Sequence, residues 1–68
     1  MSAALTPWPP RIGKPATRAL TEAEITSREK LCQWTEARIL ALHGVGPKAV
    51  NILRDDLHEA GLDFSRLR

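Results

Sequence analysis

A glycine-rich turn followed by a lysine is the segment of this sequence best suited to binding chemistry. Residues 44–48 read Gly-Val-Gly-Pro-Lys and separate two stretches of helical apolar spacing. Glycines let an external group approach the backbone closely, and the unpaired N–H groups at a helix N-terminus attract anions. Backbone amides contact phosphates rather than bases. The segment therefore predicts a phosphate site at Gly44, Gly46 and Lys48, with Val45 turned inward to anchor the turn.

Other interpretations of the polar residues are weaker. The two glycines could form only a tight turn between helices, and the segment is not a P-loop because its spacing is too short and no Ser or Thr follows the lysine. His43 and His58 have no partners at metal-ligand spacing, which argues against a metal site. His43 is expected at the surface of the hairpin, able to contact phosphate. Asp55 and Asp56 are adjacent on a predicted helix and diverge by about 100°. No metal, cofactor or enzyme activity is predicted.

The turn resembles the helix-hairpin-helix motif, a pattern of hydrophobic, Gly, hydrophobic, Gly, two variable residues and Ala. The match runs from Gly44 to Ala49. Proteins with this motif bind DNA without sequence specificity, through phosphates across the minor groove. A degenerate second copy lies 33 residues earlier, where Gly13 aligns with Gly46. The resemblance implies two pseudo-symmetric units, with Gly13, Lys14 and Arg18 contacting the second strand.

Residues 12–67 also resemble the C-terminal domain of the bacterial RNA polymerase α subunit. The shared features are an opening helix, Thr-Glu before a Leu-rich helix, a Val-Gly-x-Lys turn, a long helix and a closing Gly-Leu. In that family the hairpin Gly and Lys touch DNA, and here they fall on Gly46 and Lys48. The family's minor-groove Arg and its partner Asn fall on Pro15 and Arg18. Only the backbone-binding half of its chemistry therefore transfers to this chain.

The elements that must position these residues are helical throughout. Proline at the first helical position favours helices from Pro15 to about Ala23 and from Pro47 to about Ala60, and Gly61 is the expected C-terminal cap. Ser27 and Thr35 are predicted N-caps of two shorter helices. We therefore expect an all-α bundle of four to five short helices. The predicted core consists of twelve side chains: Leu20, Ile25, Leu31, Trp34, Ile39, Leu42, Val45, Val50, Leu53, Leu57, Leu62 and Phe64.

Length and composition set the outer bounds. A chain of 68 residues allows one domain, predicted over residues 12–68 behind a flexible, Pro-rich tail at residues 1–11. Whether Trp8 packs onto the domain is left open. The sequence has no apolar run long enough for a membrane span. A single cysteine, Cys32, and no apparent signal peptide indicate a reducing cytoplasm. A monomer is expected, because no long apolar stripe is left over.

The net charge of +2 is small, but the charges are sorted along the chain. Basic residues flank both glycine turns, at Arg11, Lys14 and Arg18 and again at Lys48 and Arg54. Acids then follow together, at Asp55, Asp56, Glu59 and Asp63. This order predicts a positive patch for DNA phosphates, in a module that acts alone or with a larger nucleic-acid-processing protein. The alternative is a protein-docking module that uses the acidic cluster.

Overall fold

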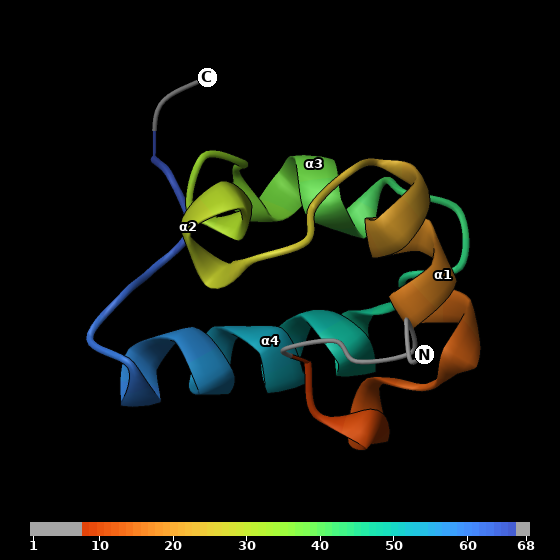
Figure 1. The fold of residues 1–68 in the computed structure, drawn as a ribbon, viewed down its shortest axis with the longest axis horizontal. Coiled ribbons are helices and arrows are strands. Elements are labelled where there is room, and N and C mark those ends of the chain that lie inside the picture. Colours follow the sequence, from red (N-terminus) through yellow and green to blue (C-terminus); the bar gives the residue numbers. More distant parts are fainter. Residues whose placement is uncertain (1–7, 67–68) are drawn as a thin grey trace.

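The computed structural model describes residues 8–66 of the chain, and within them it contains five helical segments (Figure 1). They are the 3₁₀ helix η1 (Pro10–Ile12) and the α-helices α1 (Lys14–Glu22), α2 (Arg28–Leu31), α3 (Glu36–Leu40) and α4 (Pro47–Glu59). The prediction of an all-α fold is confirmed. Helices α3 and α4 run along the length of the molecule, and the turn that joins them lies at the same end as α1.

The helix starts follow local capping rules. The Ser27 hydroxyl accepts a hydrogen bond from the Lys30 N–H at 3.2 Å, and the Thr35 hydroxyl accepts one from the Arg38 N–H at 3.2 Å. Each hydroxyl thereby satisfies one of the N–H groups that have no partner within the helix. Helix α4 begins at Pro47 as predicted. Short polar side chains and prolines thus set three of the helix starts without help from distant residues.

Helices α1 and α4 end in the same backbone motif but with different residues. Gly61 at the end of α4 has φ +77°, and Leu62 N–H donates to the Leu57 carbonyl at 2.8 Å. At the end of α1 the left-handed position is occupied by Glu24, with φ +62°, and Ile25 N–H donates to the Leu20 carbonyl at 2.8 Å. Both are Schellman motifs. Glu24 accepts a conformation that favours glycine because the motif places Ile25, only 1% exposed, in the core.

The core contains more small side chains than expected. Most predicted members are buried, but Trp34, Leu42 and Leu62 are only partly buried and pack against the core. Their places are taken by Trp8, Ile12 and three alanines, at positions 16, 19 and 49. Apolar periodicity favours large residues, whereas short helices that cross closely also bury small ones.

The predicted boundary between tail and domain is wrong for residues 8–11. Trp8 is only 5% exposed, and η1 packs against both α1 and α4. Proline disfavours a long helix, but its fixed φ suits the first position of a short 3₁₀ turn, and η1 begins at Pro10. The domain therefore starts at Trp8 or earlier. Residues 1–7 lie outside the described part of the chain, and the tail predicted there stays a prediction.

Candidate nucleic-acid interface

Gly44 is required by the fold. Its φ of +94° lies in the left-handed region, and a Cβ atom there would lie 2.9 Å from the backbone oxygen of Pro15. The turn between α3 and α4 is therefore held against the first turn of α1, which places the two glycine turns of the sequence side by side. Val45 is 6% exposed, so the prediction that it anchors the turn is confirmed.

Gly46 is different, because nothing inside the protein requires a glycine there. Its φ is −107°, which any residue can adopt, and a Cβ atom would meet no heavy atom within 4 Å. Of the two glycines in this turn, Gly44 has a positive φ and Gly46 does not. It is the N-cap of α4, and no side chain caps that helix start. The space beside the N-terminus of a 13-residue helix stays open.

Lys48 and the residues of the first glycine turn have the exposure that a surface site needs. Lys48, Lys14 and Arg18 are all exposed, and none is ion-paired with an acid among residues 8–66. Gly13 is the N-cap of α1, with φ +89°, and no side chain caps that helix. Gly13 and Gly46 align in the sequence but differ in backbone conformation. The φ angle is positive at Gly13 and negative at Gly46.

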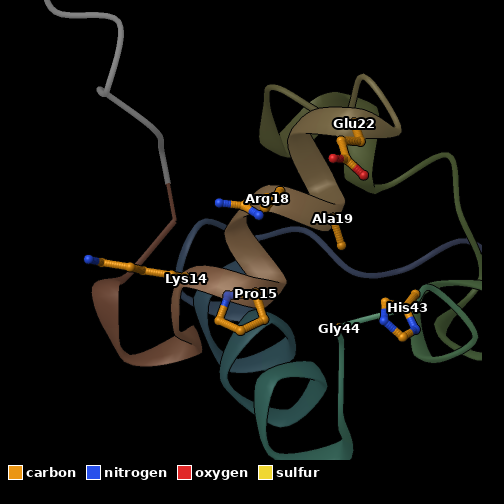
Figure 2. Close-up of a pocket in the computed structure, with 7 residues that line it drawn as sticks. All are labelled: Lys14, Pro15, Arg18, Ala19, Glu22, His43 and Gly44. Atoms are coloured by element: carbon orange, nitrogen blue, oxygen red, sulfur yellow. The ribbon is translucent and has the colours of Figure 1, made fainter.

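One hollow brings residues of both turns together. It has a volume of about 350 Å³, and its lining includes Lys14 and Arg18 from α1 and His43 and Gly44 from the turn (Figure 2). In Figure 2 the side chains of Lys14 and Arg18 extend toward the same side, and His43 lies on the opposite side. Lys48 is not part of this lining.

Glu22 also lines the hollow, and sequence reasoning did not select it. The signal was available in its spacing, because Glu22 lies one helical turn after Arg18 and shares its face. A single acidic residue in a basic segment is nevertheless ordinarily interpreted as a solvent-exposed residue on the surface of a helix. Its position became informative only once α1 was placed against the turn that carries His43.

Two arginines away from this hollow, Arg28 and Arg54, are held in ion pairs with carboxylates. Arg28 donates from Nε and Nη2 to the two carboxylate oxygens of Asp56, at 2.8 and 3.1 Å. Arg54 pairs with Glu36 at 2.6 Å between Nη2 and Oε2. The interpretation of Arg54 as a positive charge beside the turn is therefore wrong, because a carboxylate from α3 neutralises it. The acidic cluster likewise loses Asp56 to an internal ion pair.

These contacts displace the pKa values of the groups involved. The hydrogen bonds to Asp56 and Glu36 raise the pKa values of Arg28 and Arg54 above the usual range. The pKa of Asp63 is lowered, chiefly because its carboxylate accepts a hydrogen bond from the Phe64 N–H at 2.8 Å. His58 and Arg66 lie beside the same carboxylate, at 3.2 and 3.6 Å. The charges of these groups thus stabilise one another.

Comparison of the chain with protein-family models, with curated proteins and with solved structures finds no match. The resemblances noted in the sequence therefore stay predictions. Within residues 8–66, no helix has the length and apolar character needed to cross a bilayer. The same residues bring together no group of three or more His, Cys, Asp or Glu side chains that could hold a metal ion.

Proposed function

We propose that this chain is a DNA-binding module of two helix-hairpin-helix-like units, the first degenerate. It contacts phosphates of both strands across the minor groove, with little sequence preference. The observation that carries the proposal is the open space at Gly46. A glycine that neither backbone conformation nor internal packing requires is explained by the close approach of an external group.

The group that fits this space is a phosphate. The N-terminus of α4 presents backbone N–H groups and the positive end of the helix dipole, and no side chain competes for them. Lys48 adds an exposed charge in the first turn. This combination binds an anion on the sugar–phosphate backbone and reads no base sequence.

The second strand is assigned to the start of α1. Lys14 and Arg18 are exposed beside the uncapped N-terminus at Gly13, and His43 lies across the shared hollow. The close contact between Gly44 and Pro15 fixes the two helix starts relative to each other. Two phosphate sites held at a fixed spacing are what binding across a groove requires.

The charge distribution supports a nucleic-acid partner more than a protein partner. The protein-docking alternative uses the acidic cluster, where Asp55 and Glu59 are exposed. Asp56 and Asp63 of that cluster are already ion-paired. Lys14, Arg18 and Lys48, by contrast, are exposed and have no acid partner among residues 8–66.

The test is a titration of duplex DNA at 50 and 200 mM salt. We expect a Kd of about 10⁻⁴ to 10⁻⁶ M, and three phosphate contacts predict an affinity roughly 40-fold weaker at the higher salt. Lys48→Glu should weaken binding at 50 mM salt by about tenfold or more and reduce the salt slope by about one.

The matched control is Lys30→Glu, which makes the same charge change on α2 at the opposite end of the molecule (Figure 1). It should leave the affinity within about twofold, because α2 lies away from the proposed phosphate contacts and salt weakens the effect of a distant charge. Equal binding by the Lys48→Glu variant, or none by the unaltered chain at 50 mM salt, would reject the proposal. In NMR mapping, DNA should shift amides near Gly46, whereas a docking partner would shift those of residues 55–59.

A further inference from the structure

The hollow between α1 and the turn has a lining that phosphate alone does not explain. Three of its lining residues, Pro15, Ala19 and Gly44, have no polar side-chain atom, and we call these three its floor. Pro15 also has no N–H to donate. Glu22 borders the same space, and its carboxylate repels an anion. The cations Lys14 and Arg18 lie along one side only (Figure 2).

Glu22 has free hydrogen-bonding capacity. It is the last residue of α1 and is exposed, yet it forms no ion pair with any base in the described part of the chain, although Arg18 lies one turn away. A carboxylate only accepts hydrogen bonds. The partner that suits its position is therefore an N–H group on the molecule that fills the hollow.

The dimensions suit a small planar group. The hollow measures about 350 Å³, at the lower end of the range for small-molecule sites. An adjoining hollow of about 250 Å³ shares Ala19, Glu22 and His43 and adds the apolar side chains of Ala23 and Leu42. The apolar floor and the His43 imidazole match the flat faces of a nucleobase. The Glu22 carboxylate matches an edge of the base that carries an amine.

We propose that this hollow holds an unpaired nucleobase with an exocyclic amine, a specificity that rests on the DNA binding proposed above. The base lies on the floor formed by Pro15, Ala19 and Gly44 and stacks beside His43. Glu22 accepts a hydrogen bond from the amine, as acidic side chains do from N4 of cytosine. The phosphate attached to that nucleotide contacts Lys14 and Arg18. The preferred ligand is a duplex with a bulged or otherwise unpaired base that carries such an amine, for example cytosine.

The experiment compares three duplexes of the same sequence: fully paired, with one extra cytosine, and with one extra thymine. The two pyrimidines have nearly the same size, but thymine presents a carbonyl where cytosine has its amine. We expect the cytosine bulge to bind at least about fivefold more tightly than the paired duplex and than the thymine bulge.

Two variants connect this preference to the hollow. Glu22→Gln should abolish the cytosine-to-thymine ratio, because a side-chain amide both donates and accepts. His43→Ala should reduce the advantage of the cytosine bulge over the paired duplex by removing the stacking surface. Glu59→Gln is the matched control; Glu59 is exposed near the far end of α4, and this variant should retain the ratio.

The outcomes separate this inference from the function on which it depends. Paired duplex bound with a Lys48-dependent affinity, but no gain from the bulges, would overturn the base site and leave the proposed function intact. Bulges that bind more tightly with no difference between cytosine and thymine would also overturn it, since the protein would then recognise only flexible DNA. Failure to bind any of the three duplexes at 50 mM salt would overturn both.

Discussion

The arginines at the two ends of the molecule are in opposite states. At the end formed by α2 and the later part of α4, Arg28 pairs with Asp56 and Arg66 with Asp63. At the end formed by α1 and the turn, Lys14 and Arg18 are exposed without an acid partner among residues 8–66. We call these the paired end and the unpaired end.

The difference separates structural charge from binding charge. An arginine paired with a carboxylate already has a local countercharge and up to two of its five N–H donors engaged, so an external phosphate would have to compete with that partner. A lysine with no partner keeps its attraction for any anion that approaches. The net charge of +2 does not show this difference, because it sums the charges of both ends. The following variants separate the two ends further.

The largest effect is expected from Gly44→Ala, in the unpaired end. The left-handed φ and the 2.9 Å approach to the Pro15 oxygen leave no room for a methyl group. We expect a loss of about 2–3 kcal/mol in the free energy of unfolding. Urea denaturation followed by circular dichroism measures it.

The neighbouring variant Gly46→Ser is its control. Serine is a good N-cap, and a Cβ atom at this position would meet no heavy atom within 4 Å, so stability should stay within about 0.5 kcal/mol. DNA affinity should nevertheless fall about fivefold, because the hydroxyl occupies a backbone donor that phosphate needs. Equal destabilisation by the two variants would show that this end of the chain serves the fold alone.

The next effect is expected from Asp56→Asn, in the paired end. Asp56 has only 15% of its side chain exposed and accepts two hydrogen bonds from Arg28. Losing its charge and one of these bonds should cost about 1 kcal/mol of unfolding free energy. DNA affinity should not decrease. Asp55→Asn, at an exposed neighbour, should change stability by less than about 0.5 kcal/mol, and an equal loss there would contradict the pairing argument.

The smallest effect is expected in the pH dependence of stability. The folded protein lowers the pKa of Asp63 through the Phe64 N–H and the nearby His58 and Arg66. A carboxylate with a lowered pKa contributes stability above its unfolded pKa of about 3.9 and loses it as the pH falls through the folded value. Unfolding curves at pH 3 and pH 6 should therefore differ less in Asp63→Asn than in the unaltered chain. An unchanged difference would show that this carboxylate stabilises nothing.

Most of the secondary structure could be predicted, because its signals are local. Caps at Ser27 and Thr35, a proline at the start of α4 and a glycine after its end act within one turn of the chain. The end of α1 could not be predicted in the same way, because Glu24 is an unfavourable residue for its left-handed position. The burial of Ile25 stabilises that turn, and burial depends on the whole core.

The candidate site divides along the same line. Its phosphate-binding half, at Gly46 and Lys48, was predicted from residue types and spacing, and its chemistry stays a proposal. The hollow with Glu22 was not predicted, since it exists only where α1 meets a turn more than 20 residues away. Sequence spacing shows which residues share a helix face, but not which distant segment faces them.

The sequence alone therefore determined the all-α class, the starts of α2, α3 and α4, the inward Val45 and the separation of basic from acidic segments. Each of these depends on interactions within a few residues or on composition. The tertiary structure decided the burial of Trp8, the capture of Arg54 by Glu36 and the different roles of Gly44 and Gly46. These depend on contacts between segments far apart in the chain, and only a packed core fixes such contacts at a definite distance.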